Sequence, residues 1–389
     1  MPIIFLIARF KNNINKFLSE SATSFSQTIH ERQDGVNDKI KVGIVGSKFA
    51  ADFHAFSYRR NPAVEIAAVA AIDNLEPFSK KWNIPRVYAD YNEMLAKEDL
   101  DLVSVCLPNF LHHDVVLAAA GHGKNVFCEK PLATTAADAS EMITACRKAG
   151  VLLFYGEDWV FSPALRRTEE IIREGALGRL LYVKAKECHN GTHSPFAKAK
   201  QSCGGGCLIH LGIHPLGWIL YLLGNGGKNQ VVEVFGKCNG GLQDNYVHKD
   251  NGGEDFALGI LKFANGEHAF IEGNYITVGG MDDKIEIYGS EGNLKADLTF
   301  GSCLSVYSRP GYGYAIEKTD NTLGWTKPAV DEFLNLGYVD ELAYAVDCVR
   351  RKQTPQYGCS GALGLACVEI ITALYESNQT GAVVRGNWG

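Results

Sequence analysis

The stretch VGIVGSKFAA, residues 42–51, decides the fold, because an apolar strand there runs into Gly46 and then opens a helix. A glycine turn between a strand and a helix is where the G-x-G-x-x-G fingerprint of dinucleotide-binding proteins belongs. Gly46 matches the fingerprint and Ala51 is an accepted substitute for its third glycine, whereas Lys48 replaces the second. An ordinary strand–turn–helix remains open for this stretch taken alone.

Downstream of this turn, apolar strands and helices alternate. The runs at 64–72 and 102–107 are almost continuously apolar, which is typical of parallel strands buried on both faces. Further strands are expected at 125–128 and 151–155, and helices at about 50–60, 76–82, 91–96, 113–121 and 135–149. This alternation predicts an α/β fold that begins with a Rossmann domain, a doubly wound parallel sheet over residues 39–158. Its ligands should bind at the carboxyl ends of the strands.

Beyond about residue 160 the pattern changes to a series of strand-like segments. Turn signals such as Asn265-Gly266 and Glu291-Gly292 separate several of them and favour an antiparallel meander. Strands are expected at 180–188, 231–238, 256–263, 268–276, 284–288, 293–298 and 304–308, and helices at 163–174, 331–350 and 361–377. Residues 159–389 are therefore predicted to form a second α/β domain.

Length and composition agree with two globular domains. A chain of 389 residues exceeds what one hydrophobic core usually supports. A net charge of −6 gives no electrostatic footprint for nucleic acid, and no apolar run approaches the length that spans a bilayer. The eleven cysteines are an odd number and mostly lie in apolar stretches, as Cys106 and Cys367 do. That pattern favours reduced, packed thiols, so we expect a cytoplasmic protein without nucleic acid or membrane partners.

Residues 1–38 precede the first predicted strand. The apolar residues 1–8 come before the basic residues Arg9, Lys11 and Lys16, which reverses the order of a secretory signal. The Ser-rich, acid-poor composition is compatible with an organelle transit peptide. A disordered extension or a misassigned start is the interpretation that we favour.

The residues around the first turn are expected to hold the dinucleotide, namely Gly46, Ser47, Lys48, Phe49 and Ala50. The helix that starts here would direct its first N–H groups at the pyrophosphate, and Lys48 would add a positive charge. Asp73 ends the second strand, where a carboxylate can accept hydrogen bonds from the adenosine ribose and repel a 2′-phosphate. We therefore expect NAD rather than NADP. The alternative role of Asp73 is to cap the helix that follows.

Three further motifs carry a specific resemblance: PNFLH at 108–112, GKNVFCEKPLA at 123–133 and GGGCLIHLGIH at 204–214. With them, residues 40–389 resemble the Gfo/Idh/MocA family of oxidoreductases, which includes glucose-fructose oxidoreductase and inositol dehydrogenase. The resemblance implies a C-terminal α+β domain with a large open mixed sheet, and homodimers or homotetramers formed through that sheet. It also implies NAD(P)-linked hydride transfer to or from a secondary hydroxyl of a sugar, cyclitol or related compound.

The same resemblance implies roles for single residues. Lys130 would contact the cofactor and the reacting hydroxyl, His214 would be the general base, and the cofactor side would include Pro108, Asn109, His112 and Glu129. Elementary chemistry agrees, because oxidising a secondary alcohol needs one group that takes the hydroxyl proton and a cation that stabilises the developing alkoxide. A histidine titrates near neutrality and suits the first task. The alternatives are a surface lysine and a core histidine.

Two positions depart from the family pattern. The acidic residue four positions before the base is His210 here, and residues four apart on one helix share a face. Losing this carboxylate is expected to lower the pKa of His214 and to favour acidic substrates, unless His210 only hydrogen-bonds a neutral hydroxyl. Trp159 stands where arginine is common, which suggests stacking on the apolar face of a sugar. The expected substrate residues are therefore Lys130, Trp159, His210 and His214.

Three other interpretations stay open. Cys203, Cys207, His210 and His214 form a C-x3-C-x2-H-x3-H pattern of plausible zinc ligands, but structural zinc pairs normally come from two separate elements, so we expect no metal. A Rossmann protein can also lose catalysis and serve in binding or regulation. Within enzymes, tightly held NAD would allow transient oxidation of a sugar hydroxyl, with glycoside cleavage as the net outcome.

Overall fold

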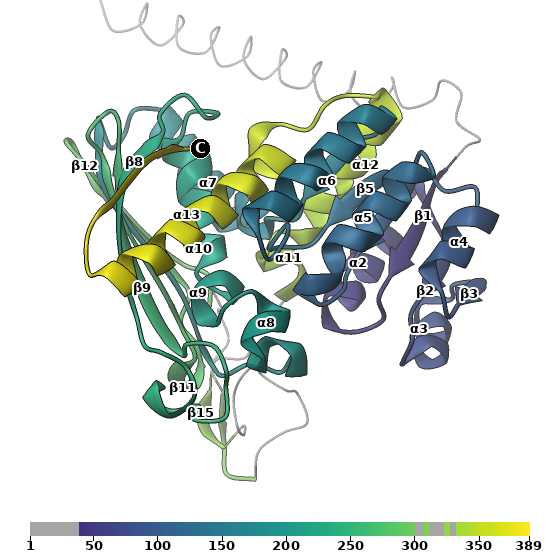
Figure 1. The fold of residues 1–389 in the computed structure, drawn as a ribbon, viewed down its shortest axis with the longest axis horizontal. Helices are drawn as coiled ribbons and strands as arrows, with labels where there is room; N and C mark the ends of the chain where they lie inside the picture. Colours follow the sequence, from purple (N-terminus) through teal and green to yellow (C-terminus); the bar gives the residue numbers. More distant parts are fainter. Residues whose placement is uncertain (1–38, 300–305, 311–322, 327–331) are drawn as a thin grey trace, which may run out of the picture. The chain divides into compact units, whose positions relative to one another are not determined.

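Six parallel strands form the sheet that the opening motif predicts, in the order β3-β2-β1-β4-β5-β6 (Figure 1). The computed structural model describes residues 39–299, 306–310, 323–326 and 332–389. The strands are β1 (Ile40–Val45), β2 (Val64–Ala70), β3 (Arg86–Tyr88), β4 (Leu102–Val105), β5 (Asn125–Cys128) and β6 (Leu153–Tyr155). Every residue of β4 is buried, as its continuous apolar run predicts. The prediction of a doubly wound parallel sheet is confirmed.

The helices between these strands begin and end at residues with clear local reasons. They are α2 (Phe49–Arg60), α3 (Leu75–Trp82), α4 (Tyr91–Lys97), α5 (His112–Gly121) and α6 (Ala136–Ala149). Asp90 caps α4 and Thr135 caps α6, each by accepting a backbone N–H, and Gly150 ends α6 with a left-handed φ of 70°. β3 was not predicted, because it is only three residues long and lies at the sheet edge.

A second sheet follows, with strands in the order β13-β12-β7-β10-β9-β8-β16 and with β11 paired to β7. These strands are β7 (Leu180–Asn190), β8 (Val231–Cys238), β9 (Phe256–Phe263), β10 (His268–Asn274), β11 (Ile276–Met281), β12 (Lys284–Gly289), β13 (Asn293–Asp297) and β16 (Val384–Trp388). β7 and β10 run parallel and the other pairs of this sheet run antiparallel, so the meander is not purely antiparallel, and the mixed sheet that the resemblance implies is confirmed. The helices between β7 and β8 carry the chain away from β7, so β10 instead of β8 becomes its neighbour.

Helix α7 (Pro163–Arg173) precedes β7, and the chain between β7 and β8 contains α8 (Lys200–Cys203), α9 (Cys207–His210) and α10 (Ile213–Leu223). The apolar segments 200–210 and 213–223 are bent by 53° relative to each other. Within the described ranges no single helix is long and apolar enough to cross a membrane, and only this bent pair passes by length and composition. Most residues of α10 are buried.

The last helices return to the parallel sheet. They are α11 (Glu332–Asn335), α12 (Tyr338–Arg351) and α13 (Gly361–Thr380), and a short hairpin of β14 (Val306–Ser308) and β15 (Gly324–Thr326) precedes them. α12 packs on α2, and α13 packs on both α6 and β8 (Figure 1). α13 therefore contacts both sheets.

Some predictions fall outside the described residues. These are the N-terminal extension at 1–38, the first residues of the strand expected at 304–308, and the start of the helix expected from residue 331. The boundary between the two domains at residues 158 and 159 stays a prediction.

Candidate active site

The loop between β1 and α2 lies at the carboxyl end of the parallel sheet and fits a bound dinucleotide. Gly46 has a left-handed φ of 118°, and a Cβ at this position would lie 2.1 Å from the carbonyl oxygen of Cys106. Only glycine therefore lets the loop pass this close to β4. Helix α2 begins with Phe49 and Ala50, and its N-cap residue is Lys48. The Lys48 side chain makes no capping hydrogen bond to the first N–H groups of the helix. These donors suit a phosphate.

Hydrogen bonds join this loop to the end of β2. Ser47 Oγ donates to the carbonyl oxygen of Asp73 over 2.6 Å, and Asn74 Nδ2 donates to the carbonyl oxygen of Ser47 over 2.7 Å. Lys48 Nζ lies 2.6 Å from Asp73 Oδ2, and both side chains are exposed. An exposed ion pair stabilises little, so the Asp73 carboxylate can exchange Lys48 for ribose hydroxyls. The N-cap residue of α3 is Asn74, not Asp73.

Asn109 and His112 tie the segment after β4 to its neighbours. Asn109 is buried in the 3-10 helix η2 (Asn109–Leu111), which Pro108 precedes, and its Nδ2 donates to the carbonyl oxygen of Cys203 over 2.8 Å. His112 is fully buried, and its ring nitrogens lie 2.8 and 2.9 Å from two backbone carbonyl oxygens. The contacts of His112 therefore hold backbone segments together.

Glu129 is an internal anchor of the Glu-Lys-Pro motif. Its Oε1 lies 2.7 Å from Nε2 of the fully buried His54, whose Nδ1 lies 2.8 Å from Ser104 Oγ. Burial acts to raise the pKa of Glu129, but the hydrogen bond and charge of His54 hold it below its usual value. The contact of His54 with Glu129 was not predicted, because one histidine in a helix gives no local signal of a buried polar partner.

Lys130 reaches from the end of β5 to the segment that carries the two candidate histidines. Its Nζ donates to the backbone carbonyl oxygen of His210 over 3.0 Å, and the residue is half-buried. The motif of the parallel sheet and the GGGCLIHLGIH segment therefore meet, as the resemblance implies.

His214 lies at the start of α10 among three carboxylates. Its Nδ1 is 2.7 Å from Glu157 Oε1 and 3.1 Å from Asp158 Oδ1, and its Nε2 is 3.9 Å from Glu187 Oε2. Trp159, in the 3-10 helix η3 (Asp158–Phe161), stacks on the imidazole with centroids 5.9 Å apart. Trp159 is only 2% exposed, so its stacking partner is His214 and its ring does not offer a sugar-facing surface.

These carboxylates reverse the electrostatic expectation for His214. Burial and the Lys130 cation lower its pKa, but Glu187, Glu157 and Asp158 outweigh them and raise it well above its usual value. Burial in turn raises the pKa of Glu157 to about 7, although the His214 charge acts in the opposite direction. The expected lowering of the His214 pKa is therefore wrong, because carboxylates from other elements replace the one absent at position 210.

The side chain of His210 contacts two aromatic side chains. Its Nδ1 is 2.6 Å from Tyr275 Oη, and its ring meets the edge of Phe196. The helix face that we expected it to share with His214 does not exist, because α9 ends at His210 and α10 begins only at Ile213 after a sharp bend.

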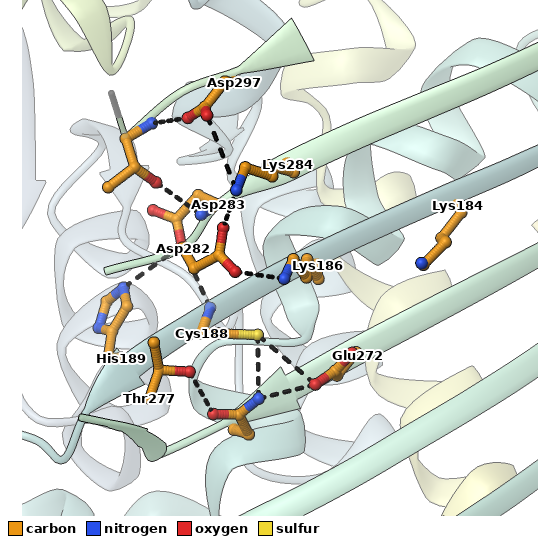
Figure 2. A network of polar contacts seen from close by, with 12 residues as sticks. Lys184, Lys186, Cys188, His189, Glu272, Thr277, Asp282, Asp283, Lys284 and Asp297 are labelled. Carbon is orange, nitrogen blue, oxygen red and sulfur yellow. Dashed lines mark hydrogen bonds and ion pairs between the residues drawn. The ribbon is translucent and has the colours of Figure 1, made fainter. Parts of the chain in front are cut away.

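β7 and the residue before β12 bring His189 and Asp283 close together (Figure 2). His189 Nε2 lies 3.2 Å from Glu187 Oε1 and 3.9 Å from Asp283 Oδ1. Burial and the Glu187 charge raise the pKa of Asp283 well above its usual value. Burial also acts to raise the pKa of Glu187, but His214 and His189 more than offset it and hold the pKa low. The two acids that lie near His189 therefore have pKa values shifted in opposite directions.

The residues of the zinc alternative have separate partners. Cys207 Sγ donates to the carbonyl oxygen of Gly273, Cys203 Sγ lies 3.8 Å from the side chain of Asn109, and the two histidines contact Tyr275 and Glu157. In the part of the chain that the structure describes, the one group of three possible metal ligands with atoms within 4.8 Å of each other is Glu157, Asp158 and His214.

A dinucleotide loop, a lysine after β5 and a histidine from the second domain, meeting at one sheet edge, define a two-domain nicotinamide-dependent oxidoreductase. A sequence model described as "Oxidoreductase family, NAD-binding Rossmann fold" (GFO_IDH_MocA) matches residues 40–157, and one described as "GFO/IDH/MocA C-terminal domain" matches residues 165–295. The chain belongs to the Gfo/Idh/MocA oxidoreductase family, and it is an NAD-binding dehydrogenase.

Several characterised proteins are similar over much of the chain. D-apiose dehydrogenase of Paraburkholderia graminis is 26% identical over 94% of each sequence. Myo-inositol 2-dehydrogenase of Thermotoga maritima is 28% identical over 66% of this chain and 75% of its own length. The crystal structure of GenD2 from gentamicin A biosynthesis, in complex with NAD, is 25% identical, has a TM-score of 0.83 and covers 91% of this chain and 98% of its own.

Proposed function

We propose that this dehydrogenase oxidises a secondary hydroxyl of a neutral sugar or cyclitol, with Lys130 and His214 acting on the hydroxyl group. The contact between Lys130 and the segment that carries His214 is the observation that carries the proposal. Lys130 Nζ is bonded to the carbonyl oxygen of His210, four residues before His214, at the carboxyl end of the parallel sheet. The relatives named for myo-inositol and D-apiose support the same class of substrate.

The two side chains have different tasks. Nε2 of His214 takes the hydroxyl proton, because Nδ1 is held by Glu157. The Lys130 ammonium stabilises the negative charge that develops on the substrate oxygen. NAD, when bound by the loop at 46–50 and by Asp73, supplies the acceptor for the hydride. In the direction of reduction, His214 returns the proton.

The charge around His214 favours a neutral substrate. Asp158 and Glu187 lie within 4 Å of its ring nitrogens, and the Lys130 cation is close enough to lower the pKa of His214. A substrate carboxylate would be repelled by the two acids, which replaces our expectation of acidic substrates.

A substrate screen tests this proposal. Purified protein with NAD should reduce the cofactor with polyols, cyclitols, aldoses or glycosides, and more slowly with the matching uronates. Preference for a uronate over its parent sugar would contradict the neutral class, while no NAD reduction with any compound would leave the proposed reaction unsupported.

We also propose a homodimer or homotetramer in a reducing compartment such as the cytoplasm. Helices α10 and α13 pack on one side of the larger sheet, while Ile260 and Tyr288 on its strands are 44% and 36% exposed. The ten cysteines among the described residues are free thiols. Light scattering of the purified protein should give a dimer or tetramer mass, and a monomer would contradict the proposal.

A further inference from the structure

The carboxylate that contacts His214 comes from an unexpected part of the chain. The family motif has an acid four residues before the base, but His210 occupies this position and contacts Tyr275. Glu157 follows β6, in the parallel-sheet half of the molecule, and its Oε1 lies 2.7 Å from His214 Nδ1. This distance is short for a hydrogen bond to a ring nitrogen, as expected when a charge is involved.

Glu157 is fixed from several directions. The residue is fully buried, and its backbone N–H donates to Glu341 Oε1 over 2.6 Å. Tyr155 Oη donates to its Oε2 over 3.5 Å, so the second carboxylate oxygen also has a contact. A buried carboxylate held in this way has few other conformations, and its position relative to His214 is set by packing.

Gly217 provides the space for this carboxylate. It lies three residues after His214 on α10, and residues three apart share a helix face. A Cβ at position 217 would lie 2.6 Å from Glu157 Oε2 and 2.9 Å from Glu157 Cδ. Any side chain here would push the carboxylate away from the helix. Glycine is disfavoured inside helices, so its presence in α10 agrees with a need for this space.

The other charged groups around His214 do not accept a hydrogen bond from its Nδ1. Asp158 Oδ1 lies 3.1 Å from the same Nδ1 but accepts no hydrogen bond within the described residues. Glu187 faces the opposite ring nitrogen at 3.9 Å, and Lys130 adds a repelling cation. One N–H makes one short bond, and Glu157 accepts it.

We propose that Glu157, given its space by Gly217, is the positioning residue that keeps the proton of His214 on Nδ1 and leaves Nε2 to accept the proton of the substrate. This inference rests on the proposed function. It assigns to the parallel-sheet half of the chain a task that the family motif places at position 210.

Two variants of the full-length protein test it, one removing the charge and one removing the space. Glu157→Gln should lower kcat about a hundredfold with little change in KM, the scale of a lost acid–base contribution. It should also shift the alkaline rise of kcat/KM to lower pH, because one carboxylate fewer stabilises the His214 cation. Gly217→Ala keeps every titrating group but displaces the carboxylate, and should lower kcat in the same way. Glu157→Asp should recover part of the Gln variant's loss.

The controls separate this inference from the proposed function. Glu170→Gln removes an exposed carboxylate paired to Arg167 on α7 and should leave kcat and the pH profile unchanged. Nitrogen-15 NMR of the histidine rings, assigned with His214→Ala, should show His214 protonated on Nδ1 and a lower pKa in Glu157→Gln, with no substrate needed. Normal kcat and an unchanged ring titration in both Glu157→Gln and Gly217→Ala would overturn the inference. Should one variant fail to fold, as judged by circular dichroism, the other decides. If Lys130→Ala and His214→Ala also keep normal turnover, the proposed function fails instead.

Discussion

His210 and His214 are four residues apart in one motif, yet they lie in opposite surroundings. His210 contacts the hydroxyl of Tyr275 and the edge of Phe196, and it is half-buried. His214 is buried against Trp159 and has carboxylates near both ring nitrogens. A bend after α9 separates them, and residues that follow β6 or belong to η3 and β7 contact the second histidine. Position in a motif therefore does not fix the charge state of a side chain; the elements packed around it do.

The largest effect should come from removing the two groups that act on the hydroxyl. Lys130→Ala and His214→Ala should each lower turnover by about a hundredfold or more, because each loses a positioned catalytic group. NAD affinity of His214→Ala should change little, as measured by fluorescence titration. Near-normal turnover in either variant would remove that residue from the mechanism.

A pH profile of the native enzyme should reveal the surroundings of His214. Because its pKa is raised well above the usual value, the free enzyme holds His214 protonated at neutral pH and must lose that proton before accepting another. The kcat/KM for oxidation should therefore keep rising above pH 7, by about tenfold per unit below the pKa, and that for reduction should fall. A profile already flat at pH 7 would show that the carboxylates do not control this histidine.

His210→Asp should have a smaller effect and sharpens the contrast between the two histidines. The new carboxylate would face Tyr275, beyond the bend that separates it from His214, so the pH profile should stay in place. Turnover should fall less than tenfold, through the lost contact with Tyr275. A rise of kcat/KM that moves to higher pH would show that position 210 still reaches His214.

The smallest effect is expected at the cofactor loop. Asp73→Ala should weaken NAD binding a few-fold and reduce the ratio of the affinity for NAD to the affinity for NADP. The effect should be small because Asp73 is exposed and already paired with Lys48. Binding titrations with both cofactors measure the ratio. A native preference for NADP would contradict the role given to Asp73.

The sequence was sufficient where chemistry and chain order coincide. The turn at Gly46, the acid after β2 and the lysine after β5 lie at strand ends, and parallel strands bring their carboxyl ends to one edge. The second domain was predicted less completely. The strands β11 and β16 were missed, and the parallel pairing of β7 with β10 depends on contacts between distant segments. Such pairings leave no local signal.

The carboxylates around His214 were missed for the same reason. Glu157 and Asp158 follow a predicted strand directly, which is a usable signal, but nothing local shows that their partner is a histidine far along the chain. Glu187 belongs to β7, and Asp283 is the residue directly before β12. Only the packing of the two sheets brings these groups to one imidazole.

Because α12 packs on α2, the first domain is completed only after a much later part of the chain has been synthesised. Phe53 of α2 packs on Phe333 and Tyr338, with ring centroids 4.4 and 4.7 Å apart, so part of the first domain is covered by residues that the ribosome adds much later. A nascent chain that has completed the parallel sheet therefore still exposes the aromatic face of α2. Exposed apolar surface of this kind is what chaperones bind and what makes intermediates aggregate. Translation must pass α12 before the cofactor domain has its full hydrophobic cover.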